Sequence, residues 1–538
     1  MEFREHILSS LAAVIFLRAT LYTELDYQVI RFVNIFLSLC FFNILFLVLH
    51  TTSFLPALLH TLSLAATFLI TLTLGIFLHR VLFHRINHFP GPFLAKVSKI
   101  YTLIICWRRP RRFEYHAAWH KQHGDIVRIG PRDLSINSIN AVALIYGSSS
   151  PCQKASFYSQ SIPEGYGSIF SIRNKKLAAH RRRAWDRTMS GVNLATYTPR
   201  LERFSSLMLQ RIGEQVERGQ EVDLTKMLRW FTFDAIGEVG MGKSYGMLDT
   251  NKQHEAVEAL LNSQWWVGVV GVTPWVLRIL PKVPMGKDPG IYKFMKWTHD
   301  QVELKTKEGV EKDDEKTIFG LLLEDDVTGY GKIPQSCLLD DARSIVAAGS
   351  DTTAATMSGT FYFLVHHPEI LAKLRQTLDE VFPNRKYDPK VHVPYLDACI
   401  NETMRLQPPV PCGLIRTTPM EGLTIDGVYI PGDINVSVPT QLIHRDPRIW
   451  KKPNDYWPER WIEGVGEGSK VFMPFTIGSY ACTGKPLAWL EMRMAVAKTL
   501  LRFDVEKLGS LDDWEARIDD YFGAQVPELK LKFTERNA

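Results

Sequence analysis

The chain has 538 residues, a formal net charge of +6 and a composition that is 46% hydrophobic and 22% charged. Such a length can bury a large core, and such a composition excludes an intrinsically disordered chain. The mild positive charge, without any run of five basic residues, argues against nucleic acid as a partner. Seven scattered cysteines, none in a C-x-x-C spacing, argue against a disulfide framework or a zinc cage and fit a reducing compartment.

Residues 1–87 are predicted to form a membrane anchor. Three apolar stretches cover residues 7–17, 32–49 and 54–78, and the last two contain no Asp, Glu, Lys or Arg. These two approach or exceed the roughly 20 residues that a helix needs to cross a bilayer. The first stretch is short and ends at Arg18, so the anchor has two or three transmembrane helices. The alternative is a buried helical hairpin of a soluble protein.

The flank after the third stretch is basic, with Arg80, Arg85, Lys96 and Lys99. Cytosolic flanks of membrane spans carry such an excess of Lys and Arg, so the rest of the chain is predicted to face the cytosol from the endoplasmic reticulum membrane. The segment 90–92, Pro-Gly-Pro, cannot continue a helix and favours an extended linker. Residues 88–538 are therefore the predicted catalytic domain.

Helical patterns dominate this second part. We expect helices over residues 334–367, 368–382, 395–406 and 485–503, and one over 198–217 with Thr198 as N-cap and Pro199 at the first helical position. Strand patterns occur at 125–130 and at 423–434, the latter around an Asp426-Gly427 turn. The predicted fold class is mainly α with a small β part.

The segment 475–484, Phe-Thr-Ile-Gly-Ser-Tyr-Ala-Cys-Thr-Gly, has the strongest chemical signal. Taken alone, a single cysteine is usually a buried hydrophobic residue. Here, however, Gly478 and Gly484 allow the loop to bend, and backbone N–H groups and the N-terminus of the following helix favour a thiolate at Cys482.

This segment resembles the haem-binding loop of the cytochrome P450 family, F-x-x-G-x-R-x-C-x-G. The resemblance implies a haem b whose iron takes Cys482 as its thiolate ligand, with Phe475, Gly478 and Gly484 shaping the loop. One position departs from the pattern. Tyr480 stands where the family usually has Arg or His to pair with a haem propionate, and a tyrosine offers no charge.

A second match to the family is Ala348-Gly349-Ser350-Asp351-Thr352-Thr353 within the long predicted helix. Hydroxyl groups there can bond backbone carbonyls and are expected to open the helix. Without the family pattern, the segment is a polar patch on a helix. The resemblance implies a groove over the haem where oxygen binds, with Asp351 and Thr352 delivering protons.

Further matches supply support for the haem. Glu402 and Arg405, three residues apart on a helix, would otherwise be an ordinary surface ion pair. The resemblance implies that they form a buried structural network with Arg460 behind the haem loop. It also implies that Arg182 and Arg416 bind the haem propionates. Because Tyr480 carries no charge, these two arginines are expected to account for more of the propionate binding.

The resemblance implies a monooxygenase that inserts one oxygen atom from O2 into an apolar small molecule. No dinucleotide-binding motif is present, so electrons are expected from an NADPH–cytochrome P450 reductase. Five basic residues are predicted to form its docking face: Arg181, Arg183, Lys451, Lys452 and Lys485. Alternatives are a P450-type rearrangement, desaturation or C–C cleavage, and a non-catalytic haem sensor or carrier.

The Gly-x-Tyr-x-Cys form of the loop and the several apolar stretches ahead of it are similar to a fungal branch that includes tryprostatin-hydroxylase-like enzymes. This closer resemblance implies a role in secondary metabolism, on a terpenoid, alkaloid or polyketide skeleton.

Overall fold

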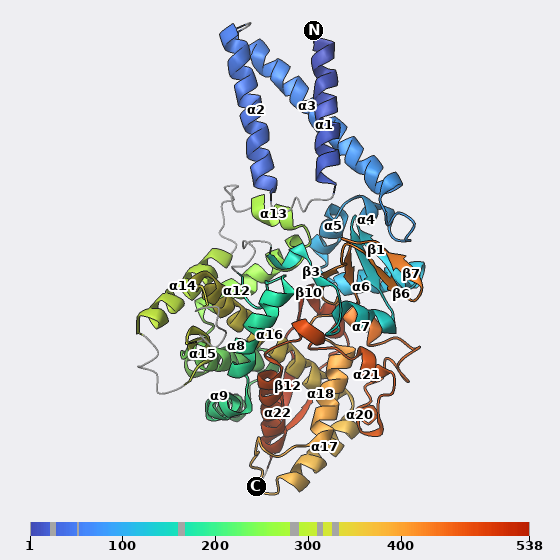
Figure 1. The fold of residues 1–538 in the computed structure, drawn as a ribbon. Helices are drawn as coiled ribbons and strands as arrows, with labels where there is room; N and C mark the ends of the chain where they lie inside the picture. The colour runs from blue at the N-terminus through green and yellow to red at the C-terminus, as the bar shows by residue number, and fades with distance from the viewer. Residues whose placement is uncertain are drawn as a thin grey trace.

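The computed structural model describes residues 2–21, 28–50, 53–159, 167–279, 290–308, 316–324 and 333–536. Three long N-terminal helices stand apart at one end of the molecule, and a larger, mainly helical unit holds the rest of the chain (Figure 1). The C-terminus lies at the opposite end from the N-terminus. The two parts correspond to the apolar leader and the mixed-composition remainder of the sequence.

The N-terminal helices are α1 (Glu2–Thr20), α2 (Val29–His50) and α3 (Phe54–Leu78), which continues into a π-helical turn, η2 (His79–Phe83). By length and composition, α2 and the joined α3–η2 can cross a membrane. Their most apolar windows are 0% and 6% buried, so they are not core helices of the larger unit. The alternative of a buried helical hairpin does not fit these exposed apolar side chains.

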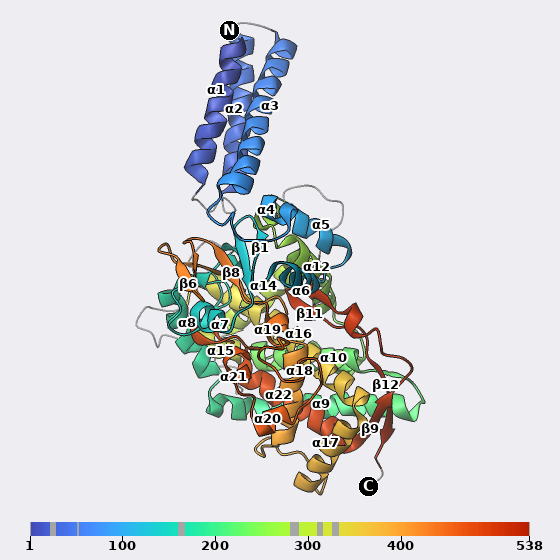
Figure 2. The same cartoon turned by 90° about the vertical axis from the view of Figure 1, so that its right-hand side faces the viewer.

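Helix α1 packs beside α3, as Figure 2 shows. Polar side chains pair across this contact: His6 Nδ1 lies 2.8 Å from Thr67 Oγ1, and Thr71 Oγ1 donates to Ser10 Oγ at 3.2 Å. A Cβ on Gly75 would lie 2.8 Å from the Leu17 side chain, so the small residue permits the close approach. Small and polar residues hold helices together in this way in lipid.

The larger unit contains many helices, and the four predicted over residues 334–367, 368–382, 395–406 and 485–503 begin and end within one residue of those observed. The first half holds α4 (Phe93–Val97), α5 (Ile100–Arg108), α6 (Arg112–His123), α7 (Ile139–Tyr146), α8 (Lys175–Thr188), α9 (Gly191–Glu217), α10 (Leu224–Ile236), α11 (Met247–Thr250), α12 (Glu255–Trp265), α13 (Pro274–Ile279) and the π-helical turns η4 (Gly237–Met241) and η5 (Trp266–Val270). The second half holds α14 (Ile291–Glu308), α15 (Ile318–Leu323), α16 (Gln335–His366), α17 (Pro368–Val381), α18 (Pro394–Leu406), α19 (Thr440–Ile443), α20 (Arg460–Glu463), α21 (Gly468–Val471) and α22 (Lys485–Arg502).

The helix predicted to start after Thr198 begins earlier. Helix α9 starts at Gly191, its N-cap is Ser190, and Pro199 lies inside it. The Thr198 hydroxyl donates to Leu194 O at 2.9 Å and does not cap a helix start. Burial of Tyr197 and the residues after it on one face outweighs the backbone hydrogen bond that a proline removes.

The β part comprises one five-stranded sheet and three smaller pairings. The large sheet has the order β1-β2-β8-β5-β3, formed by Ile126–Gly130, Asp133–Ile136, Asn435–Ser437, Arg416–Thr417 and Gln153–Lys154. Among the described strands of this sheet, β2 and β8 alone pair in parallel. The others are β4-β12-β9 (Val222–Asp223, Lys530–Glu535, Phe503–Lys507), β10-β11 (Asp519–Tyr521, Gly523–Gln525) and β6-β7 (Leu423–Ile425, Val428–Ile430), the last around the predicted Asp426-Gly427 turn.

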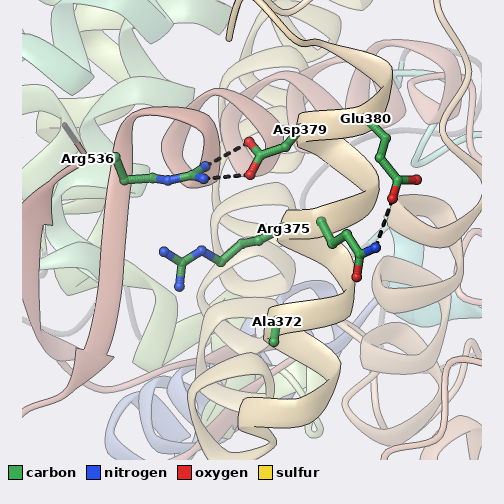
Figure 3. Close-up of a pocket in the computed structure, with 6 residues that line it drawn as sticks. Ala372, Arg375, Asp379, Glu380 and Arg536 are labelled. Atoms are coloured by element: carbon green, nitrogen blue, oxygen red, sulfur yellow. Dashed lines mark hydrogen bonds and ion pairs between the residues drawn. The ribbon is translucent and has the colours of Figure 1, made fainter. Parts of the chain in front are cut away.

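Helix α16 lies at the centre of the helical core, against α10, α18 and α22. Most of its side chains from Ser350 onward are buried. At the far end of the unit, the C-terminal segment is fastened to α17, where Arg536 donates to both carboxylate oxygens of Asp379 at 3.0 and 2.6 Å (Figure 3). The depression around this pair lies on the outer surface and belongs to the scaffold. The mainly α fold with a small β part is confirmed.

Candidate active site

Cys482 differs from the other six cysteines of the chain. Five of those are buried and one is half-buried, whereas Cys482 is exposed. Its N–H donates to Phe475 O at 2.9 Å, which closes the loop between the two residues. The loop then leads directly into α22, with Gly484 as the N-cap residue. An accessible sulfur on a closed loop at a helix N-terminus can bind a metal from outside the loop.

Gly478 is required by the shape of this loop. Its φ of +69° is in the left-handed region that favours glycine. A Cβ there would lie 2.3 Å from Tyr146 O and 2.5 Å from Gly147 C, both backbone atoms at the end of α7. Gly484 differs, because its φ is −77° and a Cβ would only touch the Cys482 sulfur at 3.9 Å. The close approach of two backbone segments therefore explains the first glycine and not the second.

The electrostatic surroundings of Cys482 act in both directions. The dense protein around the sulfur raises the pKa of the Cys482 thiol, whereas the N–H groups of Gly484 and Lys485 and the charge of Arg182 lower it. Arg182 on α8 also donates from Nη1 to Ala481 O at 2.5 Å, next to the cysteine. Burial is the larger effect, so the pKa of the Cys482 thiol lies above its ordinary value in the protein alone, and the N–H groups and Arg182 offset only part of that rise.

Arg416, on β5, is 1% exposed. It lies among aromatic rings, with its guanidinium carbon 5.2 Å from the Tyr146 ring centroid and 5.0 Å from that of Tyr480. Among the residues that the structure describes, no carboxylate pairs with Arg416, and its Nε atom has no hydrogen-bond partner. A buried cation without a counter-ion indicates that an anionic group belongs beside it.

Ile415, the residue before Arg416, lines a small cavity. Apolar side chains on its wall include Phe157, Ile415 and Phe522, and Arg112 and His116 are among the polar ones. The rings of Phe157 and Phe522 stack with centroids 5.4 Å apart. This wall places apolar surface next to the arginine.

Glu402 is the centre of a fully buried ionic network behind the loop. Arg405 donates to both of its carboxylate oxygens at 2.9 and 2.8 Å, and Arg460 Nε donates to Oε1 at 3.0 Å. Trp461 Nε1 donates to Oε2 at 2.9 Å. The exposed fractions of Glu402, Arg405 and Arg460 are 0%, 0% and 4%. The structure thus brings together all three residues predicted for this network.

His444 connects the network to the cysteine loop. Arg405 Nη1 donates to His444 O at 2.8 Å, and the Nε2 atom of His444 accepts from Met473 N at 3.1 Å. Burial and the Arg405 charge lower the pKa of His444 to about 3, so the ring is neutral and able to accept that hydrogen bond. Met473 lies two residues before Phe475, where the loop starts. No local motif reveals this connection, because His444 and Met473 lie 29 residues apart in the chain.

On α16, Asp351 is 8% exposed and Thr352 is half-buried. The hydroxyl of Thr352 donates to Ala348 O at 2.9 Å and that of Ser350 donates to Val346 O at 2.7 Å. The helix nevertheless remains continuous here, so the expected opening is wrong. These hydroxyl bonds add to the backbone hydrogen bonds without replacing them, and α10 packs along the same stretch.

Two partners of Asp351 were not evident from the sequence. Arg229 on α10 lies 3.7 Å from its Oδ1, and Gln264 on α12 donates to its Oδ2. Burial raises the pKa of Asp351, whereas Arg229 and Gln264 lower it. Arg229 is partly exposed and connects the buried carboxylate to the surface. No local motif marks either partner, because both come from helices distant in sequence.

The predicted docking face needs one correction. Arg181 is 6% exposed and forms an ion pair with Asp341, which is fully buried. It is a structural residue and not available to a partner. The other four predicted residues are exposed: Arg183, Lys451, Lys452 and Lys485.

The comparisons agree with this geometry. The family model for cytochrome P450 matches residues 99–533. The chain is 32% identical over 479 residues to cytochrome P450 monooxygenase FCK2 of Fusarium pseudograminearum, covering 86% of this chain and 84% of the relative. It is 30% identical over 475 residues to tryprostatin B 6-hydroxylase of Neosartorya fischeri, covering 86% and 84%.

The chain therefore belongs to the cytochrome P450 family, and it is an oxidoreductase of the monooxygenase kind. The family implies a haem with a thiolate-ligated iron, a redox partner and a small-molecule substrate. The residues present fit that group: Cys482 offers an accessible sulfur, and Arg416 is a buried cation that no described carboxylate compensates.

Replacing Glu402 by Ala leaves Arg405 and Arg460 buried without a counter-ion. We expect a loss of about 3–5 kcal/mol of stability, measured as urea-induced unfolding of the detergent-solubilised protein. The control Glu463→Ala removes an exposed carboxylate on α20 and changes stability by less than about 0.5 kcal/mol. A Glu402→Ala loss as small as that of the control would show that the network is dispensable.

Proposed function

We propose that the chain is a membrane-anchored haem-thiolate monooxygenase that inserts one oxygen atom from O2 into an apolar small molecule of fungal secondary metabolism. The observation that carries this proposal is the accessible sulfur of Cys482, which faces the N–H groups of Gly484 and Lys485 at the start of α22. Haem, when bound, supplies the iron that activates dioxygen. Cys482 is proposed as the axial ligand of that iron.

Other residues of the loop region have supporting roles in this proposal. Arg182 and Arg416 bind the haem carboxylates, while Phe475, Gly478 and Gly484 shape the loop. Glu402, Arg405 and Arg460 are proposed to hold the loop from behind, since the two arginines donate to five backbone carbonyls as well as to Glu402. Their contribution is a rigid position for the sulfur, which preserves the ligand geometry through turnover.

Asp351 and Thr352 are proposed to move protons towards bound dioxygen. Arg229 holds the Asp351 carboxylate near the surface side of α16, and Gln264 orients its second oxygen. A carboxylate in such a place can take a proton from solvent and release it inward. The hydroxyl of Thr352 donates to a backbone carbonyl, so its oxygen is free to accept a hydrogen bond from an arriving proton carrier.

The substrate and the electron source are proposed by analogy with the relatives. Tryprostatin B 6-hydroxylases of two fungi are among them. Terpenoid, alkaloid and polyketide skeletons are the proposed substrate classes, and the apolar wall formed by Phe157, Ile415 and Phe522 supports an apolar ligand. Electrons are proposed to come from NADPH through a membrane-bound cytochrome P450 reductase.

The anchor is proposed to place residues 88–538 on the cytosolic face of the endoplasmic reticulum membrane. Beside the anchor, α4, α5 and α13 expose apolar side chains, among them Phe93, Leu94, Ile104, Trp107 and Trp275. Exposed aromatic and aliphatic residues next to a span are typical of a surface that rests in the membrane interface. Among the described residues only α2 and α3–η2 have the length and composition of a span, and α1 carries Arg4, Glu5 and Arg18. A third span is proposed because α1 packs along α3 and its 19 residues measure about 28 Å, close to the bilayer core.

The thiolate is tested by the reduced, carbon-monoxide-bound difference spectrum of membranes that contain the protein. Wild type is expected to show the red-shifted band of a thiolate-ligated haem, and Cys482→Ala is expected to lose it. The control Cys40→Ala removes another thiol and should keep the band. An ordinary haem band in the wild type, or a retained red-shifted band in Cys482→Ala, would refute Cys482 as the ligand.

The proton role is tested with Asp351→Asn in membranes supplied with reductase and NADPH, with tryprostatin B among the first compounds tested. Product formation is expected to fall by roughly 10²–10⁴-fold, as for loss of a general acid, while the carbon-monoxide band is retained. The solvent deuterium isotope effect should increase. The control Arg218→Met alters an exposed residue at the end of α9 and should leave turnover unchanged. Unchanged turnover in Asp351→Asn would remove this residue from the mechanism.

The three-span anchor is tested by adding a glycosylation acceptor sequence to either terminus. Because three spans put the N-terminus in the lumen, only the N-terminal tag should receive a glycan. Modification of neither tag would mean that α1 does not cross, and modification of the C-terminal tag alone would reverse the proposed orientation.

A further inference from the structure

Lys154 and Arg416 lie directly opposite each other in the five-stranded sheet. Strand β3 pairs antiparallel with β5, and the register joins Lys154 to Arg416 and Gln153 to Thr417. Directly opposite residues point to the same face, and like charges in such a pair repel each other. Both residues are buried, with exposed fractions of 6% and 1%. The register of the sheet therefore holds two basic side chains together inside the protein.

No described carboxylate compensates this pair. Lys154 Nζ donates to the carbonyl oxygens of Ile169 and Phe170 at 2.9 and 2.8 Å. Arg416 Nη1 donates to Ile415 O at 3.1 Å and lies 3.5 Å from the Tyr158 hydroxyl. Burial and the neighbouring charges of Arg416 and Arg182 lower the pKa of Lys154. Carbonyl dipoles alone are weak compensation for two buried charges, so this place in the fold calls for an anion.

The ring of Tyr480 lies close to both cations. Lys154 Nζ is 4.7 Å from the centroid of its ring, and the Arg416 guanidinium carbon is 5.0 Å from the same centroid. The Tyr480 hydroxyl donates to Arg173 O at 2.7 Å, which fixes the ring. The face of an aromatic ring attracts cations, whereas a guanidinium at this position would bring a third positive charge into the cluster.

We propose that Lys154 binds a haem carboxylate in place of the arginine or histidine that the loop pattern has at position 480. In this arrangement Tyr480 is the neutral ring against which Lys154 and Arg416 are held. A haem carries two carboxylates, and their two negative charges match the two uncompensated cations. The inference rests on the proposed function, since it requires a haem on Cys482. It adds a residue from β3, more than 300 positions before the loop, to the cofactor site.

The competing interpretation is that Lys154 is only structural and ties the carbonyls of residues 169 and 170 to the sheet. That interpretation predicts a loss of stability that is independent of the cofactor's carboxylates. Lys176 offers a matched control because it is exposed and also carries one positive charge. Lys154→Met and Lys176→Met therefore remove the same charge, but only the first removes a member of the Lys154–Arg416 pair.

The first measurement is the rate of haem transfer from the purified holoprotein to apomyoglobin. Lys154→Met is expected to lose haem at least about tenfold faster than wild type, as for a lost hydrogen bond to a charged group, and Lys176→Met within about twofold of it. Lys154→Arg, which keeps the charge, should restore most of the retention. The reduction potential should fall in Lys154→Met alone, because removing a cation favours the ferric state. Equal rates in all variants would overturn the proposal.

The second measurement restores the arginine of the family pattern. Tyr480→Arg alone should accelerate haem loss because it crowds three cations together. The double variant Lys154→Met/Tyr480→Arg should return towards the wild-type rate, since one cation again replaces the other. If Tyr480→Arg alone slows haem loss and the double variant gives no recovery, Lys154 does not hold the position proposed for it.

The third measurement separates a cofactor contact from a structural role. Apoprotein is reconstituted with haem or with its dimethyl ester, which has no free carboxylates. The difference between wild type and Lys154→Met should disappear with the ester and persist if Lys154 is only structural. A wild type without the thiolate band would refute the proposed function itself. If the wild type shows the band and the Lys154→Met variant retains haem normally, only this inference is refuted.

Discussion

The ion pairing of Glu402 with Arg405 and Arg460 is the interaction on which we propose that the position of the cysteine loop depends. The two carboxylate oxygens of Glu402 are shared between Arg405 and Arg460 in a place with no access to water. Such a pair contributes little net free energy when complete, but removing one partner leaves a charge that nothing compensates. The guanidinium groups in turn bind backbone carbonyls on several segments, and His444 passes this support to the start of the loop. We therefore propose that the charge network behind the loop keeps the sulfur in a fixed position.

On the β-sheet side of the site, the buried basic residues have no described carboxylate beside them. Behind the loop both arginines of the network contact Glu402, whereas on the β-sheet side the described partners of Lys154 and Arg416 are rings, carbonyls and the Tyr158 hydroxyl. The first arrangement is complete within the chain, and the second is complete only with an anionic cofactor. This contrast explains why the loop can tolerate Tyr480 in place of a cation. The positive charge is supplied by a strand instead of by the loop.

Several parts of the fold and the site could be predicted because their signals are local. The apolar stretches, the long α16 and the hairpin at Asp426-Gly427 follow from composition and spacing within one segment. The wrong predictions share a different cause. Helix α9 passes through Pro199, α16 stays closed at its polar segment, and Arg181 is buried against Asp341. In each case packing against a distant helix outweighed the local preference.

The sequence by itself determined the family, the mainly helical class, the apolar leader and the cysteine that the site is built around, because each depends on residues close together in the chain. The tertiary structure alone decided which charges meet. It pairs Asp351 with Arg229 and Gln264 from other helices, and it sets Lys154 opposite Arg416 through the register of two short strands. A lone lysine or arginine carries no mark of its partner in the sequence. Its energy depends on the burial and the charge that surround it, and both are properties of the folded chain.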